Sequence, residues 1–121
     1  MGYDGNNIFA RLLRGEIPAK KLHETEHVLA FHDIRPLAPV HVLVIPKGAY
    51  ESLDDFSAKA SPVEQAALMK AIGDVARLTG IDKTGYRVIA NNGRDGHQEV
   101  PHLHFHVLGG RPLGRMVRRP E

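Results

Sequence analysis

The segment His102-Leu103-His104-Phe105-His106-Val107-Leu108 alternates histidines with apolar residues. Because successive side chains of a β-strand point to opposite faces, this alternation predicts a strand over residues 102–108 with three imidazoles on one face. Neighbouring imidazoles on such a strand start from Cα atoms about 6.5–7 Å apart. Histidine is not a strong strand former, so strand propensity does not account for three of them on one face. The pattern therefore indicates a chemical role for the histidines.

Two kinds of chemistry are compatible with this arrangement. The first is metal binding, because imidazole is a good ligand for zinc, copper and nickel. The chain has no cysteine, so the candidates for a fourth ligand are His41, Asp95, His97 and Glu99. The second is nucleophilic attack on phosphorus, since a neutral imidazole forms a covalent intermediate and leaves again when water attacks. Neighbouring imidazoles can fix its tautomer, protonate the leaving group and keep it neutral near pH 7.

The polar loop over residues 91–99 favours chemistry at phosphorus. Its glycines allow backbone N–H groups to turn toward an anion. Asn91 and Gln98 add side-chain hydrogen-bond donors to the same loop. Together with the three histidines, the loop predicts an anion site, and we expect neither a bound metal nor another cofactor.

The rest of the chain predicts an α+β domain. The long central helix has the clearest signals, because Ser61 and Glu64 form a capping box around Pro62 at the first helical position. Gly80 is placed to end this helix. Short links between the other elements favour antiparallel strands. We predict a mostly antiparallel sheet of about five strands with one short N-terminal helix and one long central helix. The remaining predicted elements are a helix over 7–14, a hairpin over 21–33, and strands over 40–45, 86–90 and 102–108.

Length and composition are those of one globular domain. The chain has 121 residues, of which 42% are apolar and 25% are charged, and these fractions are near the average for globular proteins. We expect a single domain over 1–121, with residues 1–6 and 112–121 as flexible or extended tails. The absence of cysteine excludes disulfides, thiolate nucleophiles and iron–sulfur sites.

Charge and hydropathy argue against two classes of partner. The net charge of +2 is too small for a nucleic-acid-binding surface. No apolar run approaches the ~20 residues needed to span a bilayer, and the first residues lack the features of a secretion signal. We therefore expect a cytoplasmic protein that binds neither nucleic acid nor a membrane. The basic residues near the end suit a modest anionic ligand at least as well as an anionic polymer; they are Arg111, Arg115, Arg118 and Arg119.

The histidine segment resembles the signature of the histidine triad family, in which three histidines alternate with apolar residues and a second apolar residue follows the last. The resemblance covers nearly the whole chain and points to the Hint-type branch of this family, the nucleoside phosphoramidases. It rests on the segments Ile8-Phe9, Gly15-Glu16-Ile17-Pro18-Ala19-Lys20, Ala30-Phe31-His32-Asp33-Ile34, Ala38-Pro39, His41, Val44-Ile45-Pro46-Lys47 and Leu108-Gly109-Gly110-Arg111.

The resemblance implies hydrolysis of a nucleoside 5′-phosphoramidate, or of a related nucleotidyl substrate, to a nucleoside monophosphate and an amine. By position, His104 is then the nucleophile that forms a nucleotidyl-histidine, and His106 contacts the phosphate and the bridging atom. His102 orients the nucleophile, and His41 matches a fourth, supporting histidine. The implied ligand is a purine nucleoside monophosphate or phosphoramidate. The implied assembly is a homodimer whose two sheets join, with the long helix near the interface.

The resemblance also implies a nucleotide pocket. Phe31 and Ile34 would line the base, and Asp33 would bind the ribose hydroxyls. The nucleotide-binding residues that it implies further along the chain are Asn91, Gln98, Glu99, His104 and His106.

Three departures from the family concern the leaving group and the tail. Glu99 occupies the position of a serine that helps the leaving group in the best-known eukaryotic members, and Pro101 replaces an aromatic residue. A carboxylate at that position donates a proton only if its pKa is raised, and repels phosphate when it is ionised. The C-terminal segment lacks the family's aromatic residue that reaches the partner's site. In this chain, any contribution of the C-terminal segment to the partner's site would come from Arg115, Met116 or the arginines that follow.

Two alternative functions share the same pocket. A dinucleoside polyphosphate hydrolase of this family is disfavoured by the ending Leu108-Gly109-Gly110-Arg111 and by the similarity to the Hint-type branch. A non-enzymatic nucleotide-binding or interaction protein is disfavoured by the three aligned imidazoles, which binding alone does not require.

Overall fold

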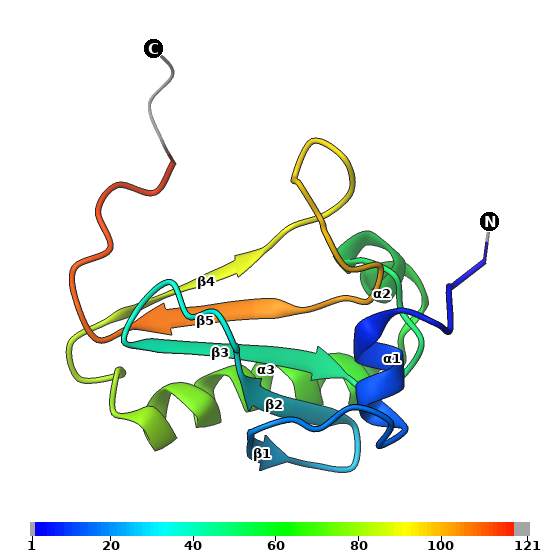
Figure 1. The fold of residues 1–121 in the computed structure, drawn as a ribbon, viewed down its shortest axis with the longest axis horizontal. Helices are drawn as coiled ribbons and strands as arrows, with labels where there is room; N and C mark the ends of the chain where they lie inside the picture. Colours follow the sequence, from blue (N-terminus) through cyan, green and yellow to red (C-terminus); the bar gives the residue numbers. More distant parts are fainter. Residues whose placement is uncertain (1, 118–121) are drawn as a thin grey trace.

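The computed structural model describes residues 2–117 as an open five-stranded antiparallel sheet with three helices. The strands lie in the order β1-β2-β3-β5-β4, and α3 runs along one face of the sheet (Figure 1). This architecture confirms the predicted α+β fold. The elements are α1 (Ile8–Leu13), β1 (Lys21–Glu24), β2 (Val28–His32), β3 (Val40–Pro46), α2 (Leu53–Lys59), α3 (Pro62–Thr79), β4 (Tyr86–Ala90) and β5 (Phe105–Gly109).

The two faces of the sheet are covered by different elements. One face carries side chains such as Val42 and Val107, which are fully buried in a core shared with α3. On the other face, Phe31 packs with Phe9 and Leu12 of α1 in a second, smaller core. Burial of both faces stabilises the sheet through the transfer of apolar surface out of water.

The predicted helix signals are present in the structure. The Ser61 hydroxyl accepts a hydrogen bond from the Glu64 N–H, and the Glu64 carboxylate accepts one from the Ser61 N–H, both at 3.1 Å. Gly80 ends α3 with a φ of 80°, a conformation that glycine adopts without a steric penalty. Asn7 caps α1, because its side chain accepts hydrogen bonds from the N–H groups of Phe9 and Ala10. Both predicted helices are therefore confirmed within about a residue at each end.

The last strand is shorter than predicted. It begins at Phe105, whereas the alternation predicts a strand from His102. Its last pairs with both neighbours are at Phe105, which lies opposite Val44 of β3 and Ala90, the last residue of β4, and the preceding backbone finds other partners. The Leu103 N–H donates to the Tyr50 carbonyl at 2.8 Å, outside the sheet. The alternation of faces nevertheless continues, since Leu103 lies in the α3 core.

The sequence analysis does not predict α2. This helix of seven residues begins after Ser52, whose hydroxyl accepts a hydrogen bond from the Asp55 N–H at 3.2 Å. Asp54 and Asp55 lie in its first turn, where carboxylates interact favourably with the helix dipole. Only Phe56 of α2 is buried, so its apolar pattern is too short to identify a helix.

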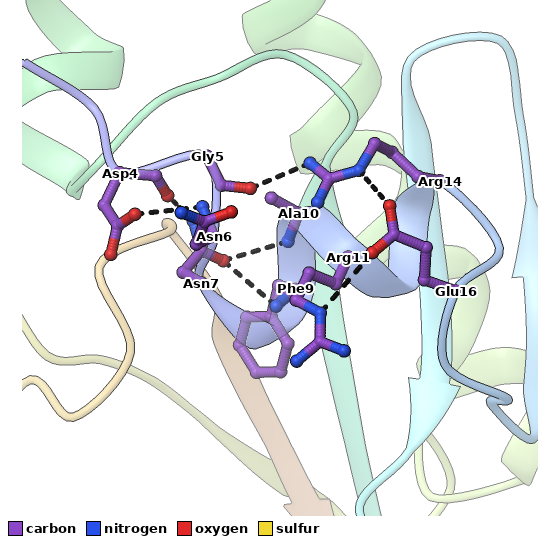
Figure 2. A network of polar contacts seen from close by, with 9 residues as sticks. All are labelled: Asp4, Gly5, Asn6, Asn7, Phe9, Ala10, Arg11, Arg14 and Glu16. Carbon is purple, nitrogen blue, oxygen red and sulfur yellow. Dashed lines mark hydrogen bonds and ion pairs between the residues drawn. The ribbon is translucent and has the colours of Figure 1, made fainter.

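The residues before α1 form a turn where the sequence analysis expects a flexible or extended tail. Figure 2 shows the turn, in which the Asn7 side chain donates to the Asp4 carbonyl at 2.7 Å. At the other end, Arg118 and Arg119 lie outside the described residues. Within residues 2–117, no helix combines the length and the apolar character that a membrane span requires.

Candidate active site

The histidines of the segment and His41 lie on the sheet face opposite α3. His41 is on β3 and His106 on β5, where these strands are antiparallel neighbours. His41 pairs with Leu108, two residues beyond His106, so the two imidazoles lie diagonally across the strand pair. The His104 ring lies beside that of His106, with 5.1 Å between the ring centroids. The structure therefore brings His41, His104 and His106 together.

Hydrogen bonds fix which nitrogen of His41 and of His106 carries a proton. The Leu37 N–H donates to Nδ1 of His41 at 3.1 Å, so this nitrogen has no proton. The neutral His41 ring then carries its proton on Nε2, which lies 2.9 Å from Nδ1 of His106. His106 accepts this hydrogen bond, and its own proton is therefore on Nε2. The Asp33 carboxylate lies 3.5 Å from the same His41 Nε2 and favours a proton there.

The tautomer of His104 is fixed by the backbone. Its Nδ1 lies 2.8 Å from the carbonyl oxygen of His102, and a carbonyl can only accept. Nδ1 of His104 therefore carries the proton, and Nε2 has a free lone pair. The Phe9 ring contacts His104 edge to face, with 5.0 Å between centroids, and limits how the imidazole can turn. This arrangement holds an unprotonated ring nitrogen in a fixed orientation.

The His102 side chain has a different environment from the other two. It is completely buried, and its Nε2 donates to the Pro46 carbonyl at 2.8 Å. Its Nδ1 accepts a hydrogen bond from the hydroxyl of Tyr3. The sequence analysis assigns His102 to orienting His104, and the group of His102 that contacts His104 is its backbone carbonyl.

The four histidines of the site (His41, His102, His104 and His106) are neutral at pH 7, because the pKa of each is lowered. Burial lowers the pKa of His102 and of His104, because a charged imidazole loses hydration inside the protein. Burial also lowers the pKa of His41, although the Asp33 carboxylate opposes the effect. The pKa of His106 falls to about 4, through burial first and then repulsion by His104 and His41. A neutral imidazole is the form that can act as a nucleophile.

A cleft with an apolar part and a polar part opens beside these histidines. The apolar part has a volume of about 440 Å³, and its walls include Phe9, Ile17 and Phe31. The polar part, of about 420 Å³, is lined by His104 and His106 among others. The two parts share the lining residues Asp33, Ile34, Leu43, Glu99 and Val100. The shared walls make one continuous cleft with an apolar end and an imidazole end.

The predicted nucleotide-binding residues have different positions around this cleft. Phe31 lines the apolar part, Asn91 lines the polar part, and Asp33, Ile34 and Glu99 line both. Gln98 is not among the lining residues of either part. Its side chain is occupied by the loop, because its amide donates to the carbonyls of Glu51 and Val100, at 2.7 and 3.0 Å, and its oxygen accepts from the Gly93 N–H.

Four residues near the histidines have contacts or a backbone conformation that the sequence reasoning did not predict. Tyr3, Phe9 and Leu37 contact the imidazoles from parts of the chain without a chemical motif. His97 lines the polar part, and its Nε2 lies 3.3 Å from the Glu99 carboxylate. Among residues 2–117, it is the only non-glycine residue with a positive φ, of 59°. The glycines at 93 and 96 mark the loop as a turn but do not identify which residue adopts this conformation.

The geometry of the imidazoles does not favour the metal site considered above. A ligand set of three alternating histidines requires their nitrogens to converge, and the ring of His102 instead bonds Pro46 and Tyr3. Ligand atoms of Asp33, His41 and His106 do lie within 4.8 Å of one another. However, the hydrogen bond between His41 and His106 uses the facing nitrogens of both rings, and a cation there would have to break it.

Comparison with known proteins gives similarity over most of the chain. Residues 14–113 match the family model of the HIT domain. An uncharacterized 13.2 kDa HIT-like protein of Azospirillum brasilense is 62% identical over 117 residues, which cover 97% of this chain and 96% of that protein. The purine nucleoside phosphoramidase of Escherichia coli K12 is 43% identical over 112 residues, covering 91% of this chain and 92% of that enzyme.

Solved structures are similar as well. A HIT family hydrolase from Clostridium thermocellum superimposes with a TM-score of 0.85 at 38% identity, covering 93% of this chain and 97% of that one. For a histidine triad nucleotide-binding protein from Candida albicans, the TM-score is 0.78 at 30% identity, with coverages of 96% and 87%. The motif, the fold and these similarities agree, and the chain belongs to the histidine triad family.

Proposed function

We propose that this protein is a hydrolase of purine nucleoside 5′-phosphoramidates, acting through a covalent nucleotidyl-histidine at His104. The observation that carries the proposal is the fixed tautomer of His104. The His102 carbonyl holds the proton on Nδ1, at 2.8 Å, and leaves Nε2 of a neutral ring as the nucleophilic atom. His104 lines the polar part of the cleft, where a phosphate would be bound.

The reaction has two displacements at phosphorus. In the first, Nε2 of His104 forms a bond to the α-phosphorus, the P–N bond of the substrate breaks, and the departing nitrogen takes up one proton to leave as an amine. In the second, water forms a bond to phosphorus, the bond to Nε2 breaks, and the proton of the water is released. The products are a nucleoside monophosphate and an amine. His106 donates a hydrogen bond from Nε2–H to the phosphate or the bridging nitrogen in both steps.

The cleft fits the other parts of such a substrate. The apolar part, with Phe9, Ile17 and Phe31 in its walls, accommodates a base. Asp33 lies where the apolar and polar parts meet, which suits a carboxylate that binds ribose hydroxyls. The 43% identity to a purine nucleoside phosphoramidase of Escherichia coli supports a P–N substrate with a purine.

The test is hydrolysis of adenosine 5′-phosphoramidate by the wild type and by the His104→Ala variant. We expect the substitution to lower kcat by at least about 10³-fold, because no other neutral imidazole has the same free Nε2, while adenosine monophosphate binding changes by only a few-fold. His27→Ala is the matched control, since His27 lies at the β1–β2 turn and contacts Glu26. Its activity should equal that of the wild type.

Mass spectrometry of a rapidly denatured reaction should detect a nucleotidyl adduct on the peptide that contains residues 102–108. The same assay with a dinucleoside polyphosphate compares P–N with P–O–P cleavage. Full activity of His104→Ala would refute the proposed nucleophile. Faster hydrolysis of the dinucleoside polyphosphate would favour the alternative substrate class.

A further inference from the structure

The N-terminal residues lie against the histidine segment, although the two are about a hundred residues apart in the sequence. The Tyr3 hydroxyl donates a hydrogen bond to Nδ1 of His102, and the two rings meet edge to face with 5.6 Å between centroids. Tyr3 is outside the span of residues 14–113 that matches the HIT domain. The contact therefore lies outside the part of the chain that the family model describes.

The hydrogen bonds of His102 leave one role for Tyr3. The Pro46 carbonyl can only accept, so Nε2 of His102 carries the proton and Nδ1 carries the lone pair. The Tyr3 hydroxyl is the donor that satisfies this lone pair. Because His102 is completely buried, an unsatisfied Nδ1 would be energetically costly. The ring is thus held at both nitrogens.

His102 connects Tyr3 to His104. The backbone carbonyl of His102 accepts the hydrogen bond from Nδ1 of His104 and sets its tautomer. Residues 102–104 precede β5, so no sheet hydrogen bonds hold this carbonyl in place. The Leu103 N–H of the same peptide unit bonds the Tyr50 carbonyl at 2.8 Å, and the two side-chain hydrogen bonds of His102, to Pro46 and to Tyr3, add to that restraint.

A network of polar contacts fixes the backbone that carries Tyr3 (Figure 2). The Asp4 carbonyl accepts from the Asn7 backbone N–H at 3.2 Å and from its side chain at 2.7 Å. Arg14 donates to the Gly5 carbonyl at 2.8 Å and also pairs with Glu16. These contacts tie the turn to α1, which reduces the entropy lost when Tyr3 binds His102.

We propose that Tyr3 is a positioning residue for His104. Its hydroxyl holds the His102 ring, the ring holds the His102 backbone, and the His102 carbonyl keeps the proton of His104 on Nδ1. The kinetic part of this inference rests on the proposed function of His104 as a nucleophile. Its structural part, the effect of Tyr3 on the His104 tautomer, does not depend on the substrate.

The kinetic test compares Tyr3→Phe with the wild type on adenosine 5′-phosphoramidate. The substitution removes one oxygen and keeps the ring that packs on His102. We expect kcat to fall about tenfold, the effect of one lost hydrogen bond on the barrier, while KM stays within about twofold. Tyr86→Phe is the matched control, because it removes the hydroxyl of an exposed tyrosine on β4, where Tyr86 pairs with Gly109 and not with a histidine. It should change kcat by less than about twofold.

The structural test uses ¹⁵N NMR of the histidine side chains in the same three proteins at a temperature where all are folded. In Tyr3→Phe we expect the Nδ1 resonance of His102 to shift and the population of His104 with its proton on Nε2 to rise. Unchanged kcat together with an unchanged His104 tautomer would overturn the proposal. If the wild type hydrolyses no phosphoramidate, the proposed function fails, and the tautomer measurement alone decides the role of Tyr3.

Discussion

At the scale of single residues, backbone groups determine the chemistry of the imidazoles. The Leu37 N–H assigns the tautomer of His41, and the His102 carbonyl assigns that of His104. Substituting these residues by others than proline keeps the backbone groups, so the restraints depend on the path of the chain and on the contacts that hold it. Burial then lowers the pKa of each ring, which favours the neutral form that the proposed attack on phosphorus requires.

The lowered pKa values make the stability of the protein sensitive to acid. The native pKa of His106 is about 4, whereas an unfolded chain has the ordinary value of 6.5. Between these values the unfolded chain binds a proton that the native protein does not, so the free energy of unfolding falls as the pH falls. Urea titrations at pH 7 and pH 5 should differ by on the order of 1–2 kcal/mol from His106 alone.

The control for this measurement is His106→Asn, which has no group that titrates at this position. Its stability should decline less between pH 7 and pH 5 than that of the wild type. The decline should not vanish, because burial also lowers the pKa of His41, His102 and His104 and each contributes with the same sign. Equal declines in the two proteins would contradict the assigned shift of His106.

At the scale of elements, the sequence predicted what depends on local patterns. The alternation in residues 102–108 correctly places Leu103 and Val107 on the α3 face of the sheet and the histidines on the opposite face, because successive side chains of an extended chain point in opposite directions. The start of β5 could not be predicted, since it depends on where its pairing with β3 and β4 stops, at Val44 and Ala90. The contact between Tyr3 and His102 was equally inaccessible, because no local pattern relates residues so far apart in the sequence.

The loop over residues 91–99 gives a prediction at this scale. The Gln98 side chain bonds three backbone groups of the loop and its surroundings, so Gln98→Ala should loosen the polar part of the cleft. We expect KM for adenosine 5′-phosphoramidate to rise about three- to tenfold and stability to fall by about 1–2 kcal/mol.

The control is Gln65→Ala, whose side chain also donates to a backbone carbonyl, that of Ala60. It should lose stability by up to about 1 kcal/mol without a change in KM. If Gln98→Ala leaves KM unchanged, the loop does not depend on this side chain.

At the scale of the whole molecule, β4 is an edge strand with apolar side chains exposed. Tyr86 and Val88 are 42% and 40% exposed. Val88 pairs with Val107, which lies in the core on the α3 face, so both exposed side chains extend that face beyond the helix. An unpaired edge strand with an apolar flank is suited to pairing with another chain. These features support the expected homodimer in which two sheets join.

Val88→Glu tests the expected dimer by placing a charge on this edge. We expect light scattering after size-exclusion chromatography to give the mass of a dimer for the wild type and that of a monomer for the variant. Lys21→Glu, on the opposite edge strand β1, should remain a dimer. A monomeric wild type would refute the expected assembly.

The positive φ of His97 has a consequence for how this protein can vary. Left-handed backbone is accessible to glycine and, at a modest cost, to asparagine, aspartate and histidine, but it is strongly disfavoured for β-branched residues. Valine or isoleucine at this position would rotate the adjoining peptide planes at the rim of the polar part of the cleft. The set of amino acids that evolution can sample here is therefore narrow, even though the side chain itself is largely exposed.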